Sequence, residues 1–262
     1  MNIKVMVAAH KKYQMPEDPT YLPIFVGAAL HDNIPSNYQG DNSGDNISLK
    51  NPNYNELTAV YWGWKNLKGD VTGLVHYRRY FREPGKRGDK FSRVLTKQSI
   101  ESALRDHDVI LPTKRRYYIE TIESHYRHSH QPQGIDALKD VFTELSPTYE
   151  NALNQTLNST SAHMFNMFIM KQSDFHEFAK WMFSVLDKVE NRIDFDTLVG
   201  NEKRVMGFIS ELLIDVWIRA NRKSYIEFPV MYMEKEHLFR KGLIFLRNKI
   251  SGSSKIINTH IK

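Results

Sequence analysis

Two apolar segments of this sequence run directly into cationic side chains. They are NIKVMVAAHKK (2–12) and GLVHYRRYF (73–81), and each begins as a β-branched strand. Arginine presents a planar donor fork that matches a phosphate group, and lysine presents a point charge. If both strands belong to one sheet, the pattern predicts an anion site, such as a diphosphate site, where they end. The alternative is that some of these cations are surface charges paired with acids, as we expect for Lys12 and Arg82.

Strand geometry limits how the second segment can act. Side chains alternate between the two faces of a strand, so Arg78 and Arg79 are expected to point in opposite directions. Only one of them would then face a given pocket, unless the strand has already ended.

Other clusters offer less specific chemistry. The segment HYRHSH (125–130) brings three histidines together, but its spacing fits no familiar zinc pattern. A solvent-facing or acceptor-binding histidine cluster is the favoured interpretation. Two Asp-x-Asp sequences, DHD (106–108) and DFD (194–196), resemble metal-binding carboxylate pairs. Neither follows an apolar strand, so we do not predict a metal site at either.

Glu211 lies within a mostly apolar helical segment, GFISELLIDVW (207–217). A carboxylate in such a setting could act as a general base at a cleft. It could also be solvated, or pair with Arg204, and spacing alone leaves these alternatives open.

These residues need elements to position them. Strands alternate with helices over residues 1–112, which favours an α/β fold with a mostly parallel sheet. Ligands on such sheets bind beyond the carboxyl ends of the strands. Strands are predicted at 2–9, 71–77, 108–112, 162–170 and 225–233, and residues 31–53 are predicted to form a long loop. Helices are predicted at 21–30 after Pro23, 54–67, 96–106, 135–145, 147–157, 173–192 with Ser173 as N-cap, and 202–221.

Composition narrows the class of protein. The 262 residues include 41% hydrophobic residues, enough for a packed core, and no cysteine. The lack of cysteine excludes disulfides and fits a reducing cytoplasm. No run of 18 apolar residues and no signal-peptide pattern is present, so neither a spanning helix nor secretion is expected.

The positive charge is concentrated at the carboxyl terminus. Six of the 36 basic residues and none of the 30 acidic ones lie in residues 237–262. The rest is neutral, which argues against nucleic acid as a partner. We therefore expect one folded domain over 1–236 and a basic tail over 237–262. Its amphipathic segment 238–250 suits either an anionic membrane surface or packing on the domain.

Several segments in order resemble a known family. They include AAHKKYQMPEDPTYLPIFVGAAL, ELTAVYWGWKNL, GLVHYRRYF, HYRHSH, FNMFIM and RVMGFISELLIDVWI. Together they resemble the bacterial capsular and exopolysaccharide glycosyltransferases once filed under a domain of unknown function. Some members are similar to galactofuranosyltransferases. The resemblance covers about residues 3 to 233.

The resemblance implies a GT-A-like, Rossmann-like fold and a UDP-sugar donor. It implies transfer of galactofuranose or another hexose to a hydroxyl of a lipid-linked or growing surface polysaccharide, such as a capsule or O-antigen. Most GT-A enzymes carry Asp-x-Asp where this chain has His76-Tyr77-Arg78. A divalent cation such as Mn²⁺ or Mg²⁺ is therefore disfavoured, and cationic side chains would offset the leaving diphosphate.

The resemblance also implies roles for individual residues. Glu211 would be the base, with His76 and Arg78 acting at the diphosphate or donor sugar. Glu120 and His125 would contact the acceptor. Donor binding is expected of His10, Lys11, Tyr13, Asp45, Asn46, Glu56, Arg79, His163, Asn166 and Arg204.

Two other classes remain open on sequence alone. One is a non-catalytic protein that binds nucleotide sugar or polysaccharide, which would tolerate loss of Glu211. The other is a peripheral membrane or RNA-binding protein that depends on the tail. The expected location is cytoplasmic, peripheral at the inner face of the cell membrane, and the sequence does not define an oligomeric state.

Overall fold

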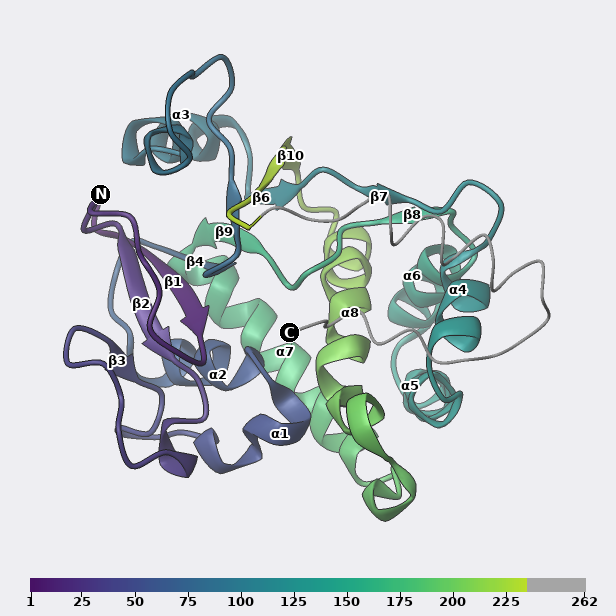
Figure 1. Cartoon of the computed structure of the whole chain (residues 1–262). Helices are drawn as coiled ribbons and strands as arrows, with labels where there is room; N and C mark the ends of the chain where they lie inside the picture. Colours follow the sequence, from purple (N-terminus) through teal and green to yellow (C-terminus); the bar gives the residue numbers. More distant parts are fainter. Residues whose placement is uncertain (235–262) are drawn as a thin grey trace, which may run out of the picture.

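A mixed β-sheet forms the centre of the molecule. The structure is a computed structural model that describes residues 1–234 (Figure 1). Its strands are β1 (Ile3–Ala9), β2 (Tyr21–Phe25), β3 (Gln39–Gly40), β4 (Val71–His76), β5 (Arg79–Phe81), β6 (Val109–Pro112), β7 (Arg115–Arg116), β8 (Ser161–Ala162), β9 (Phe168–Lys171), β10 (Tyr225–Phe228) and β11 (Val230–Tyr232).

The sheet follows the order β10-β6-β9-β4-β1-β2-β3. Strands β4, β1, β2 and β3 are parallel to one another, whereas β9 is antiparallel to both β4 and β6. Strand β5 turns back against the end of β4, and β11 pairs with β5. A separate pair is formed by β7 and β8. The predicted α/β fold with a mostly parallel sheet is confirmed.

Helices cover both faces of this sheet (Figure 1). In β1, Met6 and Ala8 pack into one apolar cluster, and Val5 and Val7 into the other, because successive side chains alternate between faces. The first cluster contains residues of α2, α5, α6, α7 and α8, and the second contains residues of α3. The helices are α1 (Asn51–Tyr54), α2 (Leu57–Asn66), α3 (Lys97–Asp106), α4 (Ile122–Ser129), α5 (Gln133–Thr143), α6 (Pro147–Leu157), α7 (Gln172–Glu190) and α8 (Val205–Asn221).

Two predicted elements have a different structure. Residues 21–25 form β2 rather than the start of a helix, because this buried segment pairs with β1 along its whole length. The strand predicted over 162–170 is divided into β8 and β9. Between them, Phe165 and Asn166 adopt left-handed φ angles of 80° and 53°, which interrupt an extended strand.

Smaller differences concern element boundaries. The segment 225–233 forms two strands, β10 and β11, which flank Pro229 and pair with different neighbours. The predicted cap Ser173 instead lies inside the first turn of α7, whose N-cap is Lys171. The predicted loop 31–53 contains β3 and the start of α1.

No helix within residues 1–234 is long and apolar enough to cross a membrane. The basic tail predicted for residues 237–262 lies outside the described residues.

Candidate active site

The carboxyl ends of β1 and β4 bring the two cationic segments together. These strands are parallel, and Ala8 lies opposite His76. The residues that follow each strand therefore leave the sheet at the same edge, as the sequence predicted. Two groups of side chains lie there, and we call them the cationic group and the carboxylate group.

The cationic group is built on two stacked tyrosines. The rings of Tyr13 and Tyr77 lie 4.0 Å apart, and His10 contacts Tyr77 edge-on at 5.2 Å. Arg78 donates a hydrogen bond to the Tyr13 hydroxyl at 3.1 Å. Lys11 Nζ lies 5.1 Å from the centre of the Tyr13 ring. Burial and the charges of Lys11 and Arg78 lower the pKa of His10, so a neutral imidazole lies among cations.

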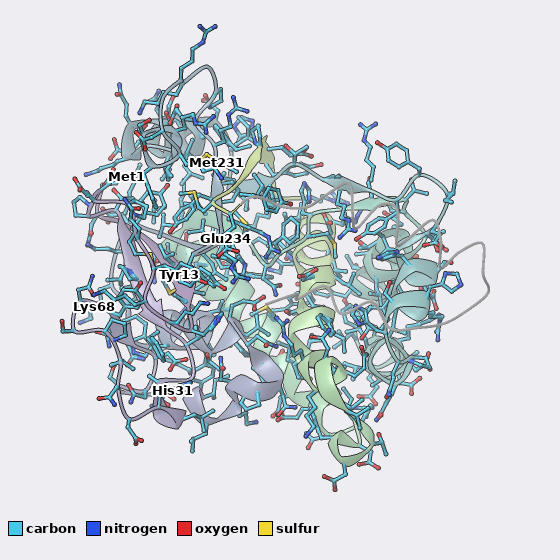
Figure 2. The ribbon with its side chains drawn as sticks, viewed as in Figure 1. Met1, Tyr13, His31, Lys68, Met231 and Glu234 are labelled. Carbon is cyan, nitrogen blue, oxygen red and sulfur yellow. The ribbon has the colours of Figure 1, made fainter. Side chains whose placement is uncertain are left out.

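Glu234 supplies an acidic partner for this group. Its carboxylate lies 3.1 Å from Arg78 Nε, and Figure 2 shows it beside Tyr13. The backbone holds it there, since Met233 N–H donates to the Arg78 carbonyl at 2.9 Å. Glu234 is about half exposed, so an incoming anion can compete with it for Arg78.

The carboxylate group lies beside the cationic group and centres on Glu211 of α8. Burial and the charge of the neighbouring Glu56 raise its pKa to about 7. Arg79 and Arg115 act in the opposite direction, as does a hydrogen bond from the Phe165 backbone. The result is a carboxyl group that titrates near neutral pH, where a general base is most effective.

His76 completes the end of β4 as a neutral side chain. Burial lowers its pKa. Its Nε2 lies 2.5 Å from the Phe165 carbonyl, which only accepts hydrogen bonds, so we assign the proton to Nε2. His76 therefore fixes the turn that carries Phe165 and leaves Nδ1 as an acceptor.

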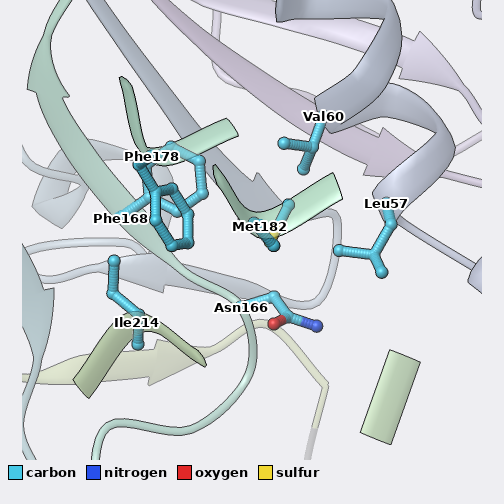
Figure 3. A pocket seen from close by; sticks show the side chains of 7 residues that line it. All are labelled: Leu57, Val60, Asn166, Phe168, Phe178, Met182 and Ile214. Carbon is cyan, nitrogen blue, oxygen red and sulfur yellow. The ribbon is translucent and has the colours of Figure 1, made fainter. Parts of the chain in front are cut away.

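Asn166 connects three elements beneath the carboxylates. Its amide donates to Glu56 at 2.7 Å and to the Gly207 carbonyl at 3.2 Å, and it accepts from the Ser210 hydroxyl at 3.1 Å. These bonds hold its left-handed backbone conformation. A cavity of about 10 Å³, lined mainly by apolar side chains, lies behind it (Figure 3). Such strained residues are enriched at functional sites, which supports this placement.

Two further arginines, Arg79 and Arg204, lie at this edge of the sheet, and Arg79 acts on Glu211. The Arg79 guanidinium lies 4.5 Å from the centre of the Phe165 ring, and its Nε is buried without a hydrogen-bond partner within residues 1–234. Arg204 donates to Asn55 at 2.7 Å. Its charge lowers the pKa of both His10 and His76, so it lies within electrostatic reach of both groups.

Glu120 and His125 flank the site from α4 and the segment before it. Glu120 lies within hydrogen-bond distance of His125 Nδ1 at 3.2 Å and of His128 Nδ1 at 3.1 Å. The His125 ring packs 4.2 Å from that of Tyr117. Burial raises the pKa of Tyr117 to about 12, with a contribution from Glu211. Tyr117 therefore connects the predicted acceptor residues to the predicted base.

Three predicted donor-binding residues lie elsewhere. His163 is fully buried, with Nδ1 2.6 Å from Asp215 and Nε2 3.3 Å from Glu227. Both ring nitrogens are engaged and solvent is excluded, so the structure does not place His163 with the cationic or the carboxylate group. The position of this polar ring next to a strand suggested a donor site. In the structure the ring contacts Asp215 of α8 and Glu227 of β10 and so connects these two elements.

Asp45 and Asn46 lie at the far end of α2. Asp45 accepts from Tyr61 at 3.2 Å and pairs with Lys65 at 3.6 Å. Glu56 precedes the other end of this ten-residue helix, which spans about 15 Å. Asn46 bonds to the backbone of its own loop. The structure thus separates both residues from the carboxylate group.

Several residues at the site were not predicted. They are Tyr77, Arg115, Tyr117, Phe165 and Tyr232. Tyr77 could have been found, because it lies within the same GLVHYRRYF segment. Arg115 and Tyr117 have no sequence signal, since only the packing of β7 against β8 brings them toward Glu211.

The two Asp-x-Asp sequences make local contacts within the fold. Within residues 1–234, no three His, Asp or Glu side chains are grouped so that they could hold a metal ion. Asp108 instead accepts from the Ser224 backbone and hydroxyl, both at 2.8 Å, and Asp194 accepts from Asp196 N–H.

The family comparison covers nearly the whole described fold. The model of a domain of unknown function, DUF4422, matches residues 4–222. The chain belongs to the DUF4422 family. The matched range contains Glu56, His76, Asn166 and Glu211, whereas β11 lies beyond it.

A solved structure is similar to this DUF4422 chain over most of its length. It is the apo structure of WbbM, described as a bifunctional glycosyltransferase. The two are 27% identical with a TM-score of 0.82, and the match covers 90% of this chain and 46% of WbbM. This chain thus spans less than half the length of WbbM. No curated protein matches the DUF4422 chain.

Proposed function

We propose that the protein is a glycosyltransferase that moves a sugar from a nucleotide diphosphate to a hydroxyl group. The observation that carries this proposal is the pKa of about 7 at Glu211, beside a group of cations at the carboxyl edge of the sheet. The carboxylate group suits a proton acceptor, and the cationic group suits an anionic leaving group. Similarity to the glycosyltransferase WbbM supports this assignment.

The cationic group would hold the donor. His10, Lys11 and Arg78 surround the Tyr13–Tyr77 stack, and Arg204 acts on the same region. A diphosphate would replace Glu234 at Arg78, since phosphate accepts the same donors with more charge. Tyr13 offers a partly exposed ring against which the nucleotide would lie.

Glu211 would carry out the proton transfer. It takes the proton of the acceptor hydroxyl while that oxygen attacks the anomeric carbon, and the bond from that carbon to the diphosphate oxygen breaks. The electron pair leaves with the diphosphate, whose charge the cations stabilise. Arg79 would contact the donor sugar or a phosphate, because its Nε has no partner within residues 1–234.

Glu120 and His125 would contact the acceptor sugar. Both lie near Tyr117, which is within electrostatic reach of Glu211. Carboxylate and imidazole groups hydrogen-bond sugar hydroxyls, so their position suits an acceptor entering from the α4 side.

The proposed reaction requires no divalent cation. The place of Asp-x-Asp is taken by His76 and Arg78, and positive side chains perform the charge compensation there. Chelator treatment followed by addition of Mn²⁺ tests this point. We expect turnover to be unchanged by either step, whereas loss with chelator and return with Mn²⁺ would contradict it.

The finer identity of the substrates rests on the sequence resemblance. It supports a GT-A-type site, a UDP-linked hexose such as galactofuranose, and a lipid-linked capsular, exopolysaccharide or O-antigen acceptor. It also supports a peripheral position at the inner face of the cell membrane.

A thermal-shift screen with UDP, GDP, CMP and TDP donors, each with and without a divalent ion, tests the donor directly. A ligand that binds the folded state raises its melting temperature. We expect the UDP donor to give the largest shift and Arg78→Ala to remove most of it. A transfer assay then separates an enzyme from a non-catalytic binding protein, which would show the shift without product.

A further inference from the structure

The segment TKRRYYI (113–119) carries a concentration of charge and of exposed apolar side chains. It joins β6 to the segment before α4 and includes β7. It contains three cations, two tyrosines and an isoleucine, and no acid.

The tip of this segment exposes its apolar side chains to solvent. Tyr118 is 82% exposed and Ile119 is 72% exposed, the two highest values among the large hydrophobic residues within 1–234. Isolated exposed apolar residues are common on protein surfaces. Two adjacent exposed apolar residues at the tip of a cationic segment are less common, and such surfaces are typical of interaction sites.

The backbone holds this tip away from the body. Arg115 and Arg116 pair with β8, and Tyr117 N–H donates to the Thr160 carbonyl at 2.8 Å. Ile119 N–H then donates back to the Tyr117 carbonyl at 2.7 Å across Tyr118, whose φ is 58°. A non-glycine residue in this conformation forms a tight turn, which directs Tyr118 and Ile119 outward.

The two arginines of this segment are open to solvent. Arg115 and Arg116 are exposed, and neither forms an ion pair within residues 1–234. Lys114 Nζ donates to the Tyr225 hydroxyl, a neutral partner, at 3.0 Å. The apolar tip is therefore bordered by the exposed side chains of Arg115 and Arg116.

We propose that residues 114–119 dock the protein on an anionic lipid surface. Tyr118 and Ile119 enter the boundary between headgroups and acyl chains, and the arginines face lipid phosphates, the combination typical of interfacial binding. Isoleucine offers nothing that reads or stacks on a base, so lipid fits the tip better than nucleic acid does. This segment is separate in sequence from the basic residues 237–262.

The docking segment also borders the candidate active site. Arg115 and Tyr117 lie within electrostatic reach of Glu211, and β7 and β8 lie between the sheet and α4 to α6 (Figure 1). If the proposed function holds, on which this last step rests, docking here brings a lipid-linked acceptor toward Glu211.

Flotation of the full-length protein with lipid vesicles tests the proposal. Vesicles of phosphatidylcholine with phosphatidylglycerol are compared with phosphatidylcholine alone. We expect binding to the anionic vesicles, weakened by salt. The double variant Tyr118→Ser, Ile119→Ser should lower the partition coefficient by about tenfold or more. The matched control Leu49→Ser, Val199→Ser changes two other exposed apolar residues and should bind as the wild type does.

Two further variants separate the loop from the tail. Arg116→Gln should lower binding by about fivefold, the contribution of one cation near an anionic surface. In a full-length variant with Arg240, Lys241 and Arg247 changed to Gln, vesicle binding should still be lost when Tyr118→Ser and Ile119→Ser are added. If the loop double variant binds vesicles like the wild type, or if single-stranded RNA binds in place of vesicles, the proposal is wrong.

A measurement of nucleotide binding distinguishes failure of the docking proposal from failure of the proposed function. The loop variant should retain the wild-type thermal shift with UDP, because neither substituted residue belongs to the donor site. Vesicle binding through the loop without any transfer in the wild type would contradict the proposed function and leave the docking surface standing.

Discussion

Helix α8 carries two carboxylates one turn apart whose pKa values shift in opposite directions. Burial acts to raise the pKa of Asp215, but hydrogen bonds from the His163 ring and backbone outweigh it, and the net shift is downward. At Glu211, burial and Glu56 prevail over Arg79, and the pKa rises to about 7.

The difference shows that partners, rather than position on the helix, decide what a buried carboxylate does. Asp215 is held by donors and joins elements of the fold. Glu211 faces another acid and retains the capacity to take up a proton near neutral pH.

The largest expected effect is on catalysis by Glu211. Glu211→Gln should lower kcat by about 10²–10⁴-fold, since the amide cannot accept the proton. In the wild type, the ionised form appears as pH rises, so kcat/KM should increase through about pH 7. Steady-state transfer assays measure both. Glu177→Gln, at an exposed acid on α7, is the control, and near-wild-type turnover of Glu211→Gln would exclude the assigned role.

Asp215→Asn should act on stability instead. Weakening the buried hydrogen bonds that Asp215 accepts from the ring and backbone of His163 costs about 1–3 kcal/mol in the free energy of unfolding. Because folding lowers the pKa of Asp215, its contribution is present above the unfolded pKa and is lost as pH falls through the folded pKa. Urea denaturation at several pH values should show the difference narrowing in acid. An unchanged midpoint at neutral pH would mean that the pair with His163 does not stabilise the fold.

Arg78→Ala should weaken UDP binding by about 10–100-fold, because a hydrogen bond to a charged group contributes about 1.5–3 kcal/mol. Isothermal calorimetry measures the dissociation constant. Arg82→Ala, four positions along and exposed, should bind like the wild type. Equal losses in both variants would indicate a general charge effect rather than a site at Arg78.

Glu56→Gln should give the smallest effect. Removing this negative charge lowers the pKa of Glu211, so the acidic limb of the kcat/KM profile should move to lower pH by up to about one unit. The glutamine carbonyl can still accept from Asn166, which preserves that contact. A limb that stays in place would show that burial alone sets the pKa of Glu211.

The sequence predicted the sheet well where its signal was local. Continuous apolar runs predicted β1, β4 and β6, and the helix predicted over 96–106 corresponds to α3. It missed β2 because Pro23 and the following alanines resemble a helix start, whereas pairing with β1 decides the conformation. It missed the break at Phe165 because aromatic and amide side chains give no sign of left-handed backbone.

The candidate site was partly predictable for the same reason. Residue types at strand ends pointed to His10, His76 and Arg78, since parallel strands must deliver their carboxyl ends to one edge. Only the tertiary structure decided that Glu56 lies near Glu211 and that His163 is buried between Asp215 and Glu227. It also decided that Asp45 lies at the end of α2 opposite to Glu56. Those outcomes depend on contacts between residues far apart in the chain, and burial and charge at such contacts are not encoded in local spacing.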